Sequence, residues 1–391
     1  MRGFLTRLSV AAGLALAASA LPEHVAAAEP VEVYAIMSTT GVAGFFGSSE
    51  ARALAVVEKV VNAGGGIQGR PLKFVVLDDQ SNPQVTVQLM NQLVAKNVPM
   101  VLGPSVPQSC FAAGPIAERS HIVEMCLNPA GRPTIGGFQF VPFPNSVDVA
   151  SASLRYFHDH GLTRIALLNA TDGSGQDATL SFNTALQLPE FRGITKVAEE
   201  SYSPTDVSVS AQVSRIKSAG AQAIVSYNAG LPLGTVLRSL NDAGLDVPVL
   251  TTGGNMTYAQ MQQYAAFLPK DMLFGGMLAW VPGDVGPGPL RDKQMAYVAA
   301  LNAEGLKSEA GYAGVWDPAF LLVDALRHAG PDATSEQVRS WLSSLHGWVG
   351  TDGVFDFRSY PQRGVGIDTV LVMRWDPASK SFAGASRRGG R

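Results

Sequence analysis

The stretch that sets the fold is VEVYAIM at residues 31–37, an apolar run that is followed by a glycine-containing loop. Beyond the loop, Leu54, Val57 and Val61 recur at helical spacing, and a second strand-like run, LKFVVL, occupies residues 72–77. Strands that alternate with helical segments predict βαβ units. A parallel sheet covered by helices on both faces is therefore expected.

The alternation continues and then begins again after residue 145. Further strands are expected at residues 98–102, 122–125, 165–168, 197–199, 223–226 and 249–250, and helices at 290–304, 315–328 and 335–345. Two short strands near 354–357 and 369–375 should complete sheets begun earlier. We therefore predict two α/β lobes joined by several chain crossings, with residues 29–145 and 276–350 in the first lobe and 146–275 and 351–391 in the second.

The composition excludes several classes of protein. The chain has 391 residues, of which 46% are hydrophobic, so it can bury a large core. Its 29 Lys and Arg residues against 32 Asp and Glu residues give a net charge of −3, which leaves no basic excess for binding nucleic-acid phosphates. With 2 cysteines, it cannot build a disulfide scaffold or a four-thiolate zinc site.

Residues 1–28 have the pattern of a cleavable secretory signal. Arg2 and Arg7 precede an apolar stretch at 8–21, and three alanines at 26–28 resemble a cleavage site. A membrane-anchoring helix is the alternative, but the apolar stretch is shorter than the roughly 20 residues that span a bilayer. We therefore expect a soluble exported protein whose mature chain begins near Glu29.

Two local motifs that resemble functional sites are better explained by structure. Gly64, Gly66 and Gly69 match the pattern G-x-G-x-x-G, but they follow a predicted helix and precede a strand, the reverse of a dinucleotide-binding loop, so we predict a turn. Asp78 and Asp79 close a strand and point to opposite sides, so we expect them to cap a loop.

The sequence gives no sign of a metal site, a cofactor or a catalytic centre. His158 and His160 lie two residues apart, on different faces of a predicted helix, which is not a metal-ligand spacing. No nucleophile and base occur in a recognisable context. We therefore expect a protein that is not an enzyme, a secreted hydrolase being the disfavoured alternative.

Cys110 and Cys126 are expected at one rim of the first sheet. Cys110 should begin the helix after the strand at 98–102, and Cys126 should end the neighbouring strand. In an oxidising compartment they can form a disulfide, which would contribute about 3 kcal/mol in the chain-entropy model. Two buried free thiols are the alternative.

Residues 62–72 (NAGGGIQGRPL) and 78–83 (DDQSNP) resemble the leucine/isoleucine/valine-type periplasmic solute-binding proteins of ABC transporters. Weaker matches in the same order extend the resemblance over nearly the whole mature chain, at 40–47, 102–104, 201–204 and 311–330. The resemblance implies a type I periplasmic binding fold, in which two Rossmann-like lobes with three hinge crossings clamp a small ligand. It also implies two inner-membrane permease subunits and two cytoplasmic ATPases as partners of a monomeric binding protein.

The family's amino-acid recognition pattern is largely missing. The position of a carboxylate-binding Ser falls at Pro107, and the position of a Thr falls at Ala130. A second-lobe Tyr falls at Ser174, another aromatic residue at Ala229, and the acidic partner of the ligand ammonium at Gly253. A buried ammonium without a carboxylate costs several kcal/mol. The resemblance therefore implies that a free α-amino acid is a poor ligand.

Aromatic and neutral polar side chains make up the expected binding site. Phe46 aligns with the family's ring-packing residue and Trp280 follows a hinge crossing, although both could be core residues. The expected ligand-binding residues are Phe46, Gln108, Ser109, Asn128, Ser174, Asn228, Gly253, Asn255 and Trp280. They predict an aromatic or other non-amino-acid carboxylate as the ligand, and the cysteine pair resembles that of a subgroup associated with aromatic acids. Amino-acid binding and ligand sensing for a membrane receptor are the alternatives.

Overall fold

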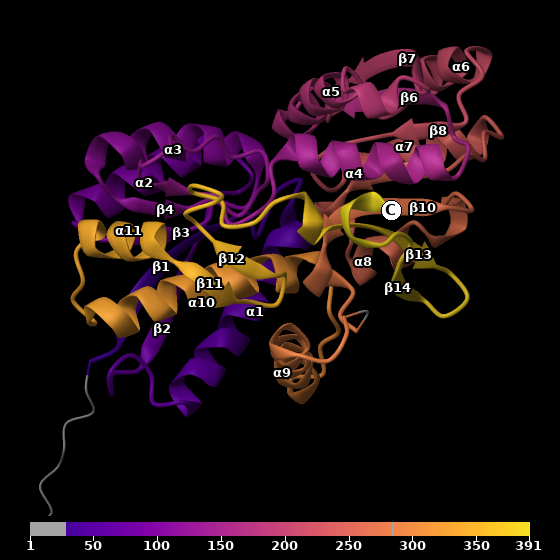
Figure 1. Cartoon of the computed structure of the whole chain (residues 1–391). Helices are drawn as coiled ribbons and strands as arrows, with labels where there is room; N and C mark the ends of the chain where they lie inside the picture. Colours follow the sequence, from indigo (N-terminus) through magenta and orange to yellow (C-terminus); the bar gives the residue numbers. More distant parts are fainter. Residues whose placement is uncertain (1–28, 284) are drawn as a thin grey trace, which may run out of the picture.

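Two β-sheets form the framework of the chain (Figure 1). The computed structural model describes residues 29–283 and 285–391, so the predicted signal at 1–28 lies outside the described residues. The first sheet contains, in spatial order, β2 (Leu72–Asp78), β1 (Val31–Met37), β3 (Met100–Leu102), β4 (Val123–Met125) and β5 (Gln139–Phe140), all parallel. The predicted α/β class with parallel-rich sheets is confirmed.

Both faces of the first sheet pack against apolar cores, because successive side chains of a strand point to opposite faces. In β1, Val33, Ala35 and Met37 join one core, whereas Ile36 packs into a second core on the opposite face. The helices that connect these strands are α1 (Gly44–Ala63), α2 (Pro83–Ala95) and α3 (Pro107–Ser120). Their apolar faces cover the sheet and exclude water from it.

The second sheet combines parallel strands with an antiparallel edge. Its spatial order is β14 (Ser381–Gly384), β13 (Val370–Asp376), β10 (Met272–Met277), β9 (Val249–Thr252), β8 (Ala223–Val225), β6 (Arg164–Ala170) and β7 (Thr195–Tyr202). Strand β13 runs antiparallel to both β10 and β14. The strand expected at 369–375 therefore completes a sheet begun earlier, as predicted.

Helices cover both faces of the second sheet and connect its strands. They are α4 (Ser146–Asp159), α5 (Gly173–Ala185), α6 (Ser210–Ser218), α7 (Pro232–Asp242) and α8 (Tyr258–Gln263). The first residues of α4 and α5 lie beyond the carboxyl ends of this sheet's strands, which is where ligands bind in open α/β sheets.

The prediction that the strand near 354–357 completes one of the two large sheets is wrong. Strand β12 (Val354–Asp356) pairs with β11 (His346–Val349) in a separate antiparallel ribbon, and it does not extend either large sheet. Phe357, just after β12, packs edge-on against Phe140 of the first sheet, with ring centroids 5.8 Å apart. Four-residue patterns carry too little information to specify a pairing partner.

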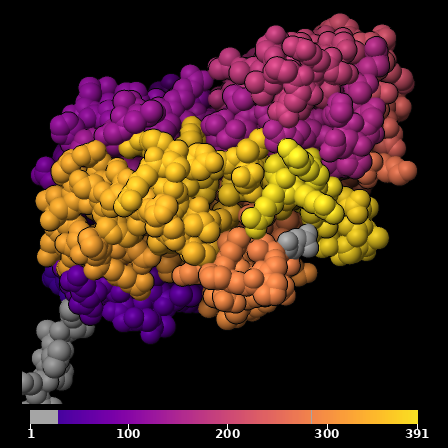
Figure 2. Space-filling model, viewed as in Figure 1, coloured from indigo at the N-terminus to yellow at the C-terminus, as the bar shows by residue number. Residues whose placement is uncertain are grey.

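Within the described residues, the chain passes between the two sheets three times, at 141–145, 278–309 and 357–369. The second crossing carries α9 (Pro289–Ala303), and α10 (Ala310–Ala329) and α11 (Ser335–Ser344) then return to the first sheet. Figure 2 shows the last third of the chain, orange to yellow, lying across the junction on this face. The predicted lobe boundaries stay a prediction. Strand β12, which falls in the predicted second-lobe segment 351–391, pairs with β11 before the last crossing.

The two motifs explained by structure behave as expected. Gly66 has a φ of +69°, and a Cβ there would overlap the carbonyl oxygen of Arg70, so the glycine-rich block is a tight turn. Asp78 accepts a hydrogen bond from the backbone N–H of Thr39 at 3.0 Å, and Asp79 accepts one from the backbone N–H of Ser81 at 2.9 Å. Both carboxylates therefore cap the loops beside β1 and β2. In the part of the chain that the structure covers, no helix is long and apolar enough to cross a bilayer.

Cys110 and Cys126 form the predicted disulfide. Cys110 lies in the first turn of α3 and Cys126 directly follows β4, and their Cα atoms are 5.8 Å apart. Both side chains are fully buried. The bond ties the start of α3 to the end of a strand, at the edge of the sheet that faces the second sheet.

Replacing both cysteines by alanine should destabilise the folded protein. The disulfide joins residues 16 positions apart, and closing a loop of this length contributes about 3 kcal/mol. The free energy of unfolding of the Cys110→Ala/Cys126→Ala variant, measured by urea denaturation, should fall by roughly that amount. Reduced wild-type protein should show a similar loss, and equal denaturation curves for all three samples would contradict the prediction.

Candidate functional site

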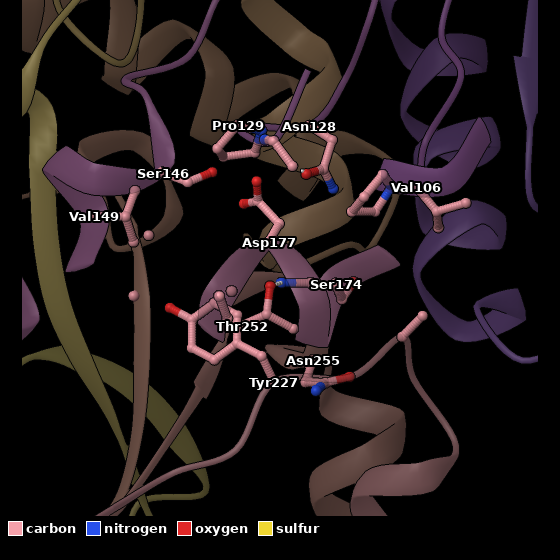
Figure 3. A pocket seen from close by; sticks show the side chains of 18 of the residues that line it. Val106, Asn128, Pro129, Ser146, Val149, Ser174, Asp177, Tyr227, Thr252 and Asn255 are labelled. Atoms are coloured by element: carbon pink, nitrogen blue, oxygen red, sulfur yellow. Dashed lines mark hydrogen bonds between the residues drawn. The ribbon is translucent and has the colours of Figure 1, made fainter. Parts of the chain in front are cut away.

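A cavity of about 90 Å³ lies between the two sheets, at the carboxyl ends of their parallel strands (Figure 3). Its walls come from the segments that follow β3, β4, β8 and β9, from β10 and from the first turns of α4 and α5. A single water needs roughly 10–15 Å³ in the same measure, so the cavity can hold a small organic molecule.

Three helices begin at this cavity. Pro107 of α3, Ser146 of α4 and Ser174 of α5 all line it, and each lies in the first turn of its helix. The N-terminus of a helix carries a partial positive charge and free backbone N–H groups. The arrangement therefore favours electronegative atoms of a ligand on these sides of the cavity.

Most of the cavity wall is apolar. The larger apolar side chains that line it are Phe46, Val106, Pro107, Leu127, Pro129, Phe143, Val149, Phe182, Met277 and Trp280. They come from helices and loops of both halves of the chain, from β10 and from the crossings between the halves. A wall of this kind suits a ligand with an apolar or aromatic body and a few polar atoms.

Seven of the nine residues expected from the sequence line the cavity. They are Phe46, Asn128, Ser174, Asn228, Gly253, Asn255 and Trp280. Gln108 and Ser109 do not line it. The Ser109 hydroxyl instead donates to Asp79 at 2.7 Å and accepts from Thr86 at 2.8 Å, within the core of the first sheet. Gln108 lies against Gly173 of α5: a Cβ added to Gly173 would lie 2.9 Å from the backbone nitrogen of Gln108.

The Asn255 side chain organises the second-sheet loops and has no capacity left for a ligand. Its amide nitrogen donates to Asn228 and Thr251, at 3.2 and 2.9 Å, and its oxygen accepts from Gly230 and Gln260, at 3.1 and 3.3 Å. These four bonds use both N–H groups and both lone pairs of the amide. Asn255 therefore positions the Asn228 loop.

Gly253 provides the surface on which Trp280 packs. A Cβ at Gly253 would overlap the six-membered ring of Trp280 and lie 2.5 Å from the carbonyl oxygen of Gly275. A Cβ at Gly276 would also overlap that ring. The indole thus fills the space that any side chain at position 253 would need, and the resemblance placed an acidic residue there.

Sequence reasoning missed Asp177, which supplies a carboxylate to the cavity from a different element. Asp177 lies in α5, one turn after Ser174, and Figure 3 shows its carboxylate directed toward Ser146 and Pro129. Among the lining residues that the structure describes, it is the one charged group, since none is Lys, Arg or His. The spacing of three residues from Ser174 on one helix face was the sequence signal that could have found it.

Burial raises the pKa of Asp177, and three neighbours oppose this change. The Ser146 hydroxyl hydrogen-bonds to the carboxylate, and the guanidinium groups of Arg132 and Arg363 lower its pKa. The guanidinium of Arg132 lies 3.9 Å from the Asp177 carboxylate. The N–H groups of Arg363 are directed to backbone carbonyl oxygens, such as that of Pro129 at 3.2 Å. Asp177 therefore has no close, hydrogen-bonded cation of its own.

A second buried carboxylate, Glu50 of α1, lies behind the cavity wall. It is hydrogen-bonded to the hydroxyl of Ser105, which lines the cavity, and its other oxygen has no partner in the described structure. Burial raises its pKa from 4.5 to about 8, and the nearby Asp79 adds to this effect. Glu50 is therefore protonated in the folded protein at neutral pH.

Contacts between the two sheets' loops close the cavity rim. The backbone N–H of Leu231 donates to the carbonyl oxygen of Val42 at 3.1 Å, directly between the two halves. Glu309 joins them a second time, because its carboxylate accepts from Ser49 of α1 and from the backbone N–H of Tyr258 at 2.9 Å. The structure is thus a closed arrangement of the two halves.

Groups that could hold a metal ion are few in the described parts of the chain. Cys110, Glu124 and Cys126 lie within 4.8 Å of one another, but both sulfurs are engaged in the disulfide and cannot act as thiolate ligands. His158 and His160 are exposed on the surface of the second half, away from the cavity.

Comparison with known families identifies residues 30–381 as a match to the model described as periplasmic binding protein. A curated relative, Leu/Ile/Val-binding protein homolog 3 of Brucella melitensis, is 25% identical over 232 residues, which cover 58% of this chain and 61% of that protein. The alignment thus spans less than two thirds of that relative's length.

Solved structures share the fold at low sequence identity. An extracellular ligand-binding receptor from Rhodopseudomonas palustris HaA2 superposes with a TM-score of 0.79 at 18% identity, covering 92% of this chain and 100% of that one. The branched-chain amino acid transporter substrate-binding protein LivJ from Streptococcus pneumoniae, in complex with isoleucine, gives a TM-score of 0.76 at 17% identity, covering 91% and 99%.

Substitution of Gly253 should disrupt the cavity wall. A Cβ there overlaps the Trp280 ring, so Gly253→Ala should lower the melting temperature by several degrees and change the tryptophan fluorescence. The neighbouring Gly254→Ala is the matched control, because a Cβ at Gly254 would meet its nearest atom only at 3.9 Å. Equal melting temperatures for the two variants would show that the packing of Trp280 does not constrain position 253.

Replacing Glu50 should change the pH dependence of stability. The folded state keeps the Glu50 proton up to a pH of about 8, whereas the unfolded state releases it near its usual pKa of 4.5, so wild-type stability falls as the pH rises between these values. Glu50→Gln carries no such proton. The melting temperature of the variant minus that of wild type should therefore increase from pH 5 to pH 8, and a constant difference would contradict the raised pKa.

Proposed function

Because the chain belongs to the periplasmic binding protein family, of the type that includes the leucine/isoleucine/valine-binding proteins, we propose that it captures one small organic solute in the cavity between its sheets. The family match confirms the resemblance inferred from residues 62–72. The relatives are solute-binding proteins, and the proposed activity is binding without chemical change of the solute.

The observation that carries this proposal is the enclosure of one cavity by both halves of the chain. Loops beyond strands of both sheets supply its wall, and the hydrogen bond between Leu231 and Val42 closes its rim. A solute in this position contacts both halves at once and stabilises the closed arrangement over an open one. Movement about the three crossings would admit and release it.

We propose an aromatic or other non-amino-acid carboxylate as the solute. The apolar wall suits its body, and the helix N-termini at Pro107, Ser146 and Ser174 suit its carboxylate. Trp280 fills the space beside Gly253, so no carboxylate at that position meets a ligand ammonium.

Amino-acid binding is the second candidate, and Asp177 is the observation that favours it. Gly253 offers no carboxylate to a ligand ammonium, whereas Asp177 of α5 brings a carboxylate to the same cavity. An ammonium group beside Asp177 would supply the close cation that this side chain lacks. The structural similarity to LivJ, whose complex contains isoleucine, agrees with this alternative.

The proposed setting is the periplasm, after removal of residues 1–28. There the closed, loaded protein would dock on an ABC permease whose cytoplasmic ATPases drive uptake. Permease and ATPase genes beside the gene for this chain would support transport, and a neighbouring receptor gene would support ligand sensing.

A thermal-melting panel tests the proposed function. Solutes that differ by one group separate the candidates: 3-phenylpropionate against phenylalanine, and 4-methylpentanoate against leucine. One class should raise the melting temperature, corresponding to about 2.7 kcal/mol at a hundredfold excess over the dissociation constant.

The panel has clear outcomes for each candidate. Stabilisation by the amine-free acids supports the non-amino-acid carboxylate, and stabilisation by the amino acids supports the second candidate. If no member stabilises the protein, or if the best solute is chemically altered after long incubation, the proposed binding function is contradicted.

A further inference from the structure

Two side chains on the cavity wall have buried polar atoms that no described group satisfies. The hydroxyl of Tyr227 and the indole N–H of Trp280 have no hydrogen-bond partner, and both residues line the cavity. Most buried polar side-chain atoms in folded proteins have a partner, because a buried group without one destabilises the folded state. Two such groups at one cavity require an explanation.

Tyr227 cannot turn to find a partner within the protein. It is the second residue after β8, its backbone N–H donates to Asn169 at 2.9 Å, and its ring packs edge-on against Phe182 with centroids 5.8 Å apart. Gly275 lies beside the hydroxyl, because a Cβ added to Gly275 would be 3.1 Å from the hydroxyl oxygen. The cavity wall next to the hydroxyl is therefore backbone without a side chain. Figure 3 shows the hydroxyl on the Val149 side of the cavity.

Trp280 is held equally firmly. Its side chain is 6% exposed, and its six-membered ring fills the space above Gly253 and Gly276. On the other half of the molecule, a Cβ at Gly314 would lie 4.0 Å from ring atom Cζ2. The indole nitrogen can only donate, so an acceptor is the one group that satisfies it.

We infer that the solute itself completes these hydrogen bonds, and that Tyr227 and Trp280 are specificity-determining residues that select solutes with an acceptor oxygen, from a carboxylate or a carbonyl group. The inference rests on the proposed function and adds to it the chemistry by which the solute is recognised. Both donors are neutral, so they bind an acceptor without adding charge. Asp177 is an acceptor as well and cannot serve the same atom of the solute.

This assignment explains why two unpartnered groups persist beside glycines. A side chain at Gly275 would crowd the Tyr227 hydroxyl, and one at Gly253 would displace the Trp280 ring. The bare backbone keeps both donors in place. The free protein is destabilised by two unsatisfied groups, and the bound solute removes that destabilisation.

Two variants that keep an aromatic ring test the inference, and of the two only Tyr227→Phe keeps the shape of the side chain. Tyr227→Phe and Trp280→Phe each remove the polar atom while an aromatic ring stays in place. Affinity is measured by calorimetry with phenylacetate, phenylacetamide, 3-phenylpropionate, phenylalanine and leucine, and with benzylamine as a probe that lacks an acceptor oxygen. We expect each variant to bind the best solute 5- to 50-fold more weakly, and benzylamine not to bind. The carboxylate and amide probes separate the two sources of the acceptor.

The free variants provide a second readout that a merely structural role would not give. Tyr227→Phe removes only the unpartnered hydroxyl, so it should leave the melting temperature of the free protein unchanged or raise it. Trp280→Phe also removes ring atoms that pack on Gly253 and Gly276, so it is assessed by its affinity alone. The matched control is Tyr297→Phe, because the buried Tyr297 hydroxyl lies 2.9 Å from that of Ser308 and away from the cavity. The control should lower the melting temperature and keep wild-type affinity.

Each outcome decides between the two proposals. If wild type binds a solute and both variants bind it with unchanged affinity, the inference is wrong and the proposed function stands. If Tyr227→Phe loses as much thermal stability as Tyr297→Phe, the Tyr227 hydroxyl serves the fold and the inference is wrong. If no probe binds to wild type, the proposed function fails and the inference fails with it.

Discussion

The close packing of the Trp280 indole on Gly253 and Gly276 is the contact on which the arrangement of the cavity depends. Trp280 lies where the chain leaves the second sheet, and its ring also approaches Gly314 of α10, which belongs with the first sheet. The ring therefore lies between parts of the two halves beside the cavity. The glycines are required because a Cβ at Gly253 or Gly276 would overlap the ring.

The two halves contribute different kinds of order around this contact. Behind the first-sheet wall, Glu50, Asp79 and the hydroxyls of Ser105 and Ser109 form buried hydrogen bonds. In the second half, the saturated amide of Asn255 fixes the loops after β8 and β9. These internal networks hold the wall in place before a solute arrives. They also leave few polar groups free to bind a solute. Recognition therefore depends more on the cavity atoms without a partner in the described structure, such as the Tyr227 hydroxyl and the Trp280 indole nitrogen.

The sequence predicted the sheets better than it predicted the site. Strands such as β1 and β2 were predicted correctly because each is a long apolar run followed by a segment with helical spacing. Strand β10 was missed because the glycines at 275 and 276 interrupt its apolar pattern. Seven of the expected ligand-binding residues line the cavity, since loops at strand ends converge in any fold of this type, and their role in binding stays a prediction. Asp177 was missed although its spacing from Ser174 on one helix was a usable signal. Tyr227 was missed because its position depends on side-chain packing, which no local pattern contains.

The position of β13 has a consequence for how the chain matures. This strand, formed by residues 370–376, lies between β10 and β14, so the second sheet lacks an interior member until these residues have been added to the chain. Until then β10 presents an unpaired edge, the kind of surface on which other chains add and precipitate. A product that ends before residue 370 would keep this edge open and would be prone to aggregation.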